Sequence, residues 1–107
     1  MPKVSSVALP HEDAKRLKEA FLKILTNIRN TTEVETLLVG LLTHTEVTMF
    51  SERLRIARML LTGNSYAKIR KAVKVTDYPI IQMNNVLHTN DQFKKIIRAR
   101  YEAGSAH

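Results

Sequence analysis

Apolar residues recur every three or four positions along most of the chain, which is the spacing of one face of an α-helix. The first such stripe predicts a helix from Pro10 to about Ile28, before the polar run Asn30-Thr31-Thr32. Residues 1–9 show no period, and we expect them to form a flexible N-terminal arm. The apolar positions of the stripe are Ala14, Leu17, Phe21, Ile24, Leu25 and Ile28.

The segment after this stripe has the Thr-x-x-Glu spacing of a capping box, in Thr32 and Glu35. Such a box opens a helix because each side chain accepts a hydrogen bond from the other residue's backbone N–H. The predicted helix ends near Leu41 and is apolar nearly all round. A helix of that kind is normally buried on several sides, and a second subunit is one candidate for the surface that buries it. Its apolar run is Leu37, Leu38, Val39 and Leu41.

A second box, Thr43 with Glu46, predicts a longer helix that ends at Gly63. Glycine is favoured there because the residue after a helix often adopts a left-handed conformation. The polar face of this helix is basic, with Arg53, Arg55 and Arg58. The residues expected to face inward are Val47, Phe50, Leu54, Ala57, Leu60 and Leu61.

Three shorter helices follow, each opened by a residue that caps helices. Ser65 precedes a helix over 66–73, Thr76 precedes one over about 77–88, and Asn90 precedes a last one ending near Gly104. No segment shows the sustained alternation of a strand, so we predict an all-α domain of six short helices over 10–104. The inward residues are Tyr66, Ile69, Val73, Ile80, Met83, Val86 or Leu87, Phe93, Ile96, Ile97 and Tyr101.

The segment of about 65–88 has the spacing of a helix-turn-helix, with the turn at Lys74-Val75-Thr76. Ile69, Val73, Val75 and Ile80 lie where such a unit packs its two helices together. Lys74 stands where glycine is common, because the position favours positive φ, and lysine costs about 1 kcal/mol there. Short turns between helices are common in small all-α proteins, so spacing alone does not decide the function.

The composition of the 107 residues narrows the function further. Cysteine is absent, which excludes disulfides, cysteine-ligated zinc and thiol nucleophiles. The four histidines are far apart, and no nucleophile or phosphate-loop motif is present, so we expect neither a metal site nor an enzyme. No apolar run reaches the roughly 20 residues of a membrane span, and no signal peptide is evident, so we expect a soluble cytoplasmic protein.

Charge distinguishes the two halves of the chain. The formal net charge is +7, but residues 53–100 alone carry 11 basic and two acidic side chains, a net charge of +9. A one-sided excess of this kind favours a polyanionic partner, either nucleic acid or an anionic membrane surface. The helix-turn-helix spacing within the same region favours double-stranded DNA.

Several blocks of residues resemble the tryptophan repressor family, and most closely its tryptophan-repressor-like branch of small bacterial regulators. The blocks are Leu42-Thr43, Arg53-Leu54-Arg55-Ile56-Ala57 and Leu60-Leu61-x-Gly63-x-Ser65-Tyr66-x-x-Ile69, within a similarity over roughly 15–100. The resemblance implies an interlaced homodimer of six-helix subunits that acts as a repressor. Its two recognition helices would enter successive major grooves of a near-palindromic operator.

The family's tryptophan pocket is matched only in part. Thr43 and Arg53 match the family pattern, whereas Gln82, Met83 and Val86 stand where the family has arginine, glycine and serine. A neutral glutamine cannot form the bidentate ion pair that arginine makes with a carboxylate. We therefore do not expect tryptophan to be the corepressor. These five residues would form a pocket that binds a different small effector or no ligand.

The remaining expectations concern DNA contacts. The groups expected to neutralise phosphates are Arg53, Lys68, Arg70, Lys71 and Lys74, with Arg55 more remote. Base edges would be read by Thr76, Tyr78, Ile81 and Gln82. Asp77 either repels phosphates, accepts from a cytosine amino group, or only stabilises the helix N-terminus. The alternative function is a protein–protein interaction module that has lost DNA binding.

Overall fold

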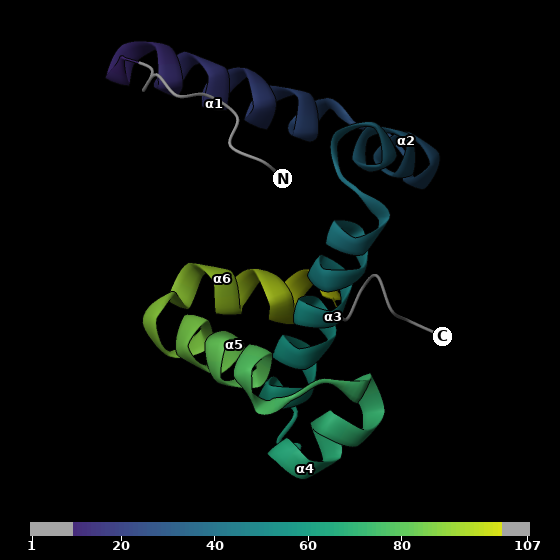
Figure 1. Cartoon of the computed structure of the whole chain (residues 1–107). Helices are drawn as coiled ribbons and strands as arrows, with labels where there is room; N and C mark the ends of the chain where they lie inside the picture. The colour runs from purple at the N-terminus through teal and green to yellow at the C-terminus, as the bar shows by residue number, and fades with distance from the viewer. Residues whose placement is uncertain (1–9, 102–107) are drawn as a thin grey trace. The chain divides into compact units, whose positions relative to one another are not determined.

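A computed structural model of the chain describes residues 10–101, which form six α-helices and no strand (Figure 1). The predicted all-α class is thus confirmed. The arm predicted for residues 1–9 and the helix end predicted at Gly104 lie outside the described residues. None of the described helices is long and apolar enough to cross a membrane. The elements are α1 (His11–Asn27), α2 (Thr31–Leu41), α3 (His44–Leu61), α4 (Tyr66–Ile69), η1 (Arg70–Lys74), α5 (Asp77–Thr89), α6 (Asp91–Ile96) and η2 (Ile97–Tyr101), where η1 and η2 are wider π-helical turns that continue α4 and α6.

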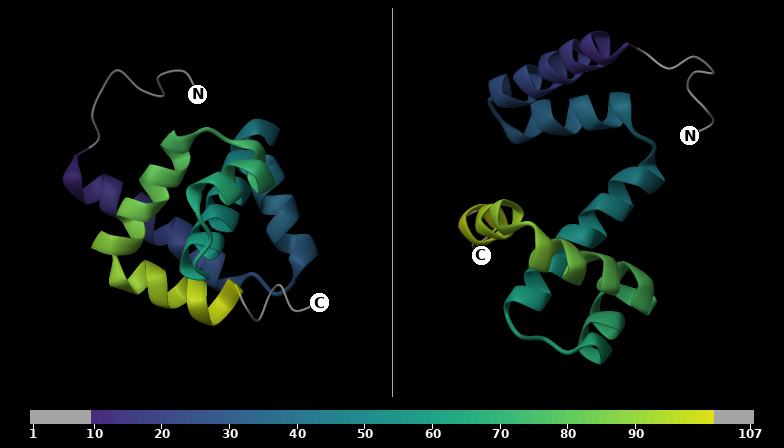
Figure 2. Two further views of the ribbon diagram at one scale, coloured as in Figure 1. Left: turned by 90° about the horizontal axis from the view of Figure 1, so that it is seen from below. Right: turned by 90° about the vertical axis from the view of Figure 1, so that its left-hand side faces the viewer.

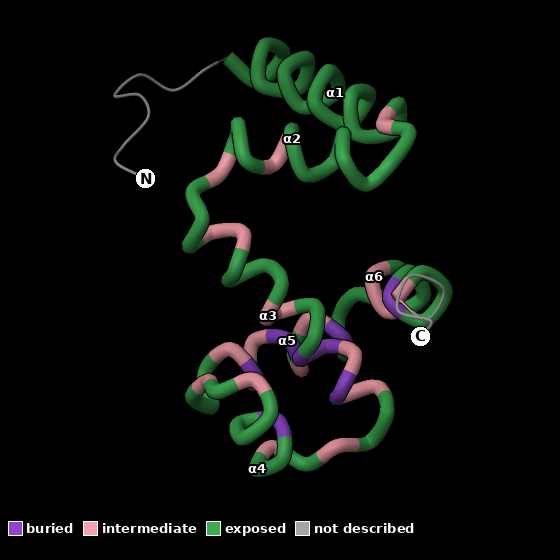
Figure 3. Tube along the Cα trace, turned by 90° about the vertical axis from the view of Figure 1, so that its right-hand side faces the viewer, coloured by how far each residue is buried: buried purple, intermediate pink, exposed green. Residues whose placement is uncertain are grey.

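The chain divides into two compact units, one ending at Leu41 and one beginning at Leu42. The described part of the first unit consists of α1 and α2, and neither helix has a buried residue (Figure 3). The apolar stripe predicted for 10–28 is present, and it remains open within this unit. The exposed large apolar residues of the two helices are Leu17, Phe21, Leu22, Ile24 and Leu25 of α1, with Val34, Val39 and Leu41 of α2.

The start of α2 corrects the predicted cap. The side-chain oxygen of Asn30 accepts from the backbone N–H of Glu33 at 2.9 Å, and the Glu33 carboxylate accepts from the backbone N–H of Arg29 at 2.9 Å. The box predicted from Thr32 and Glu35 is wrong, because the helix begins at Thr31. Asparagine caps helices as well as threonine does, and the Asn30-x-x-Glu33 spacing satisfies the same rule two residues earlier.

Both predicted ends of α3 are confirmed. Thr43 and Glu46 form the full capping box, with the Thr43 backbone N–H donating to the Glu46 carboxylate at 2.8 Å. This bond, and then the Thr43 hydroxyl, lower the pKa of Glu46 below its usual value. At the other end Gly63 has a φ of +83°, and the backbone N–H groups of Gly63 and Asn64 donate to carbonyls of the last helical turn.

The core of the second unit lies where α4, η1, α5 and η2 surround the C-terminal part of α3 (Figure 2). Three residues predicted to face inward lie on the surface. The exposed fractions are 45% for Phe50 and 42% for Leu54, both of α3, and 57% for Ile96 of α6. For Phe50 and Leu54 the prediction failed because α3 is apolar on two faces, and its neighbours pack on the face of Ile56 and Met59. The buried cluster consists of Ile56, Ala57, Met59, Ile69, Ile80, Met83 and Leu87.

The helix-turn-helix has the predicted order and turn. Ser65 caps α4 by accepting from the Lys68 backbone N–H at 3.1 Å, and Asn90 caps α6 in the same way. Lys74 has a φ of 62°, in the left-handed region that favours glycine. Thr76 precedes α5 as predicted, but its side chain makes no capping hydrogen bond.

The backbone of Lys74 leads to a stability prediction. We expect Lys74→Gly to raise the free energy of unfolding by about 1 kcal/mol, because removing Cβ relieves the left-handed strain. Lys71→Gly is the matched control in the same element. It should lower the free energy of unfolding by about 0.5 to 1 kcal/mol, because its backbone is helical. Urea denaturation at one protein concentration measures both, and equal changes would contradict the assignment of strain to Lys74.

Candidate nucleic-acid interface

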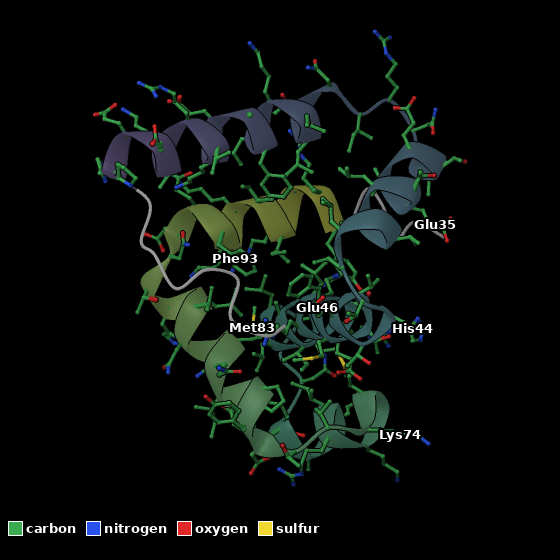
Figure 4. All side chains as sticks on the ribbon, turned by 45° about the horizontal axis from the view of Figure 1, so that its top comes forward. Glu35, His44, Glu46, Lys74, Met83 and Phe93 are labelled. Carbon is green, nitrogen blue, oxygen red and sulfur yellow. The ribbon has the colours of Figure 1, made fainter. Side chains whose placement is uncertain are left out.

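The first two turns of α5 separate core residues from surface residues. Ile80 and Met83 are buried against α3, towards which Met83 points in Figure 4. Tyr78 and Ile81 are exposed to 67% and 46%, and Gln82 is half-buried. Positions 78, 81 and 82 share one helical face, because residues three and four apart are neighbours on a helix. This outward face carries three of the four residues predicted to read bases.

The fourth such residue, Thr76, is exposed at the position before α5. Its hydroxyl makes no capping hydrogen bond, so it can donate to or accept from a ligand. Within α5, Gln82 Nε2 donates to the Tyr78 hydroxyl at 3.2 Å. The Gln82 amide keeps its carbonyl oxygen and a second N–H for other partners. In the major groove these two groups can accept from adenine N6–H and donate to adenine N7.

The basic side chains lie on the elements just before the turn. Lys68 belongs to α4, while Arg70, Lys71 and Lys74 belong to η1, and all four are exposed. Within the part of the chain that the structure describes, the three lysine ammonium groups have no ion-pair partner. Lys74 points away from the packed helices into solvent (Figure 4). Three positive charges without a partner in this part of the chain therefore lie on the elements just before α5.

Arg70 differs from these lysines because it is paired. Its Nη1 donates to Asp77 Oδ1 at 2.5 Å, and the two side chains are 43% and 53% exposed. The pair joins η1 to the first residue of α5 across the turn. Periodicity could not reveal this contact, since the two residues are seven apart and lie on different helices. It gives Asp77 a direct partner of opposite charge, which the sequence did not predict.

A cavity of about 200 Å³ lies between α3 and α5. Its lining includes Arg53, whose guanidinium also lies 5.8 Å from the centre of the Phe50 ring. Of the five residues predicted to form a ligand pocket, Arg53 and Gln82 are brought together here. Met83 is in the core, Val86 packs against the core, and Thr43 caps α3. The lining residues are Met49, Glu52, Arg53, Tyr78, Pro79 and Gln82.

A family model described as Trp repressor protein matches residues 16–101. The chain belongs to the Trp repressor family. This is a family of DNA-binding transcription regulators that use a helix-turn-helix, which here comprises α4, η1 and α5. No curated protein and no solved structure matched the chain.

The α5 wall of this cavity consists of Tyr78, Pro79 and Gln82. The Gln82 amide on this wall donates to the Tyr78 hydroxyl. The α3 wall carries charges of both signs, Glu52 and Arg53. An acidic ligand would thus meet one guanidinium and one carboxylate, which is a weak arrangement for a free carboxylate. Among residues 10–101, no group of three or more side chains could hold a metal ion.

Proposed function

We propose that the protein is a sequence-specific repressor that binds a near-palindromic operator as a homodimer. The observation that carries the proposal is the surface of the helix-turn-helix. Lysines that have no ion-pair partner among residues 10–101 precede the exposed face of α5 there. Phosphates are neutralised by Arg53, Lys68, Arg70, Lys71 and Lys74. Base edges are read by Thr76, Tyr78, Ile81 and Gln82, with Gln82 suited to adenine and Ile81 to a thymine methyl group.

The open apolar stripe of α1 supports the homodimer. Leu17 and Ile24 are exposed to 61% and 52%, and no residue of α1 is buried. Exposed apolar stripes of this length normally mark an interface. A second copy covers the stripe in the proposed assembly, and it places two recognition helices about 34 Å apart, in successive major grooves.

Selection of bound duplexes from a random pool, with and without tryptophan, tests this proposal. We expect enriched sequences with two inverted half-sites about one helical turn apart. We also expect tryptophan to change the operator affinity by less than about twofold, because Gln82 offers no guanidinium to its carboxylate. A pool without half-sites would contradict the dimeric regulator. Enrichment that requires tryptophan would contradict our interpretation of the pocket.

A protein–protein interaction module is the second candidate. The pairing of Arg70 with Asp77 favours it, because this pair reduces the charge available to phosphates. Salt dependence separates the two, since the logarithm of DNA affinity falls with a slope of about −0.9 per phosphate contacted. If no duplex binds with a dissociation constant better than about 1 μM at about 50 mM salt, the repressor proposal must be abandoned.

A further inference from the structure

The ion pair between Arg70 and Asp77 lies at the edge of the helix-turn-helix that faces DNA in the proposed function. Asp77 is the only acidic residue between Arg53 and Asn90. Its carboxylate accepts a hydrogen bond from one N–H of the Arg70 guanidinium. Both side chains are about half exposed, so the ion pair is accessible from solvent. A phosphate that approaches Arg70 therefore meets a carboxylate that already holds the same group.

We propose that Asp77 sets DNA affinity by competing with phosphate for Arg70. The inference rests on the proposed DNA binding and goes beyond it, since it assigns a role to an acidic residue within a basic surface. The guanidinium is always charged, and it forms its strongest hydrogen bonds with anionic oxygens. Asp77 is tethered to α5 within reach of Arg70, whereas a phosphate must arrive from solution.

The competition acts on all sequences alike, because phosphate contacts carry no sequence information. Non-specific binding is almost entirely electrostatic, so removing one phosphate contact lowers it directly. The contacts to base edges by Tyr78, Ile81 and Gln82 remain. Asp77 thereby lowers the affinity for duplexes of random sequence, while the contacts that recognise sequence are kept.

The opposite role for the same contact is that Asp77 orients Arg70 towards a phosphate. In that arrangement Nη1 stays on Asp77 while the other guanidinium N–H groups bind DNA. The two roles predict opposite signs for Asp77→Asn. Competition predicts tighter binding, because the amide has no charge to hold the guanidinium. Orientation predicts weaker binding.

The experiment measures dissociation constants for a random-sequence duplex over a salt series. It uses the native protein, Arg70→Ala, Asp77→Asn and the double variant. We expect Asp77→Asn to tighten binding by about five- to tenfold and to steepen the salt slope by about 0.9, the value for one more phosphate contact. We expect Arg70→Ala to cost about fivefold more in the Asp77→Asn background than in the native background.

Asp91→Asn is the matched control. It makes the same change of charge in the first turn of α6, and Asp91 has no ion-pair partner within the described residues. We expect it to change affinity by less than about twofold and to leave the salt slope unchanged. Equal gains from Asp77→Asn and Asp91→Asn would reduce the effect to net charge and overturn the proposal.

Two further outcomes separate a failure of this proposal from a failure of the proposed DNA binding. If duplexes bind and Asp77→Asn weakens binding or leaves the slope unchanged, the competition is overturned and the repressor proposal stands. If neither the native protein nor any variant binds duplex, both proposals fail together. Circular dichroism of each variant checks that folding is retained, since an exposed ion pair contributes little to stability.

Discussion

Replacing Ile24 by glutamate is expected to convert the proposed dimer into a monomer of 12.2 kDa and to weaken operator binding at least about 100-fold. Ile24 lies within the apolar stripe of α1 and is 52% exposed in the single chain. In the proposed dimer it is covered by the second copy, so glutamate there would bury a charge without a partner. Sedimentation measures the mass, and titration of the selected operator measures the loss of binding.

Thr26→Glu provides the matched control, because it adds the same charge two residues away, on the opposite face of α1. Thr26 is exposed, and its hydroxyl donates to the Lys23 carbonyl of its own helix at 2.9 Å. We expect this variant to sediment, like the native protein, at about twice 12.2 kDa. A native protein that is a folded monomer at micromolar concentration, or an Ile24→Glu variant that remains dimeric, would contradict the interlaced assembly.

Helix ends were the part of the fold that local sequence predicted best. Thr43 with Glu46, Ser65, Gly63 and Asn90 all act where their side chains or backbone freedom predicted. Caps are predictable because the bond partners lie within about four residues of one another. The same locality explains the error at α2. Two overlapping cap spacings compete there, and nothing in the local sequence ranks one above the other.

Packing between helices was predicted less well, because it depends on which of two apolar faces a neighbour covers. On α3, Phe50 and Leu54 have the spacing of a core stripe as clearly as Ile56 and Met59 do. The position of α5 decides that Ile56 and Met59 are buried. The same reason accounts for Met83, which was expected in a ligand pocket and packs in the core.

Polar contacts between the helices could not be predicted, although the apolar packing of Ile69 and Ile80 across the turn was. The pair Arg70–Asp77 and the placement of Glu52 and Arg53 beside Tyr78 depend on how α5 leaves the turn. The positive φ of Lys74 is a backbone property of the turn itself, and the position of the turn in a helix-turn-helix predicted it. The basic residues of the site were thus predictable from the sequence, whereas the acidic partners beside them were not.

Ile80 and Ile81 are neighbours in α5 that face different surroundings. We expect the alanine variant of Ile80 to lose stability and that of Ile81 to lose base preference. Ile80 is fully buried among the core residues, whereas Ile81 is 46% exposed on the face proposed to read bases. Ile80→Ala removes three methyl or methylene groups from a packed site. It should lower the free energy of unfolding by about 3 kcal/mol, the sum of lost burial and a residual cavity.

Ile81→Ala should change the free energy of unfolding by less than about 0.5 kcal/mol, because the side chain is exposed. It should instead reduce the preference for one base pair by about fivefold, since its contact is with a thymine methyl group in the proposed complex. Urea denaturation and competition between operator variants separate the two effects. Under conditions where Ile80→Ala is folded, its preference among operators should equal that of the native protein. If Ile80→Ala altered base preference while Ile81→Ala did not, the proposed orientation of α5 in the groove would be wrong.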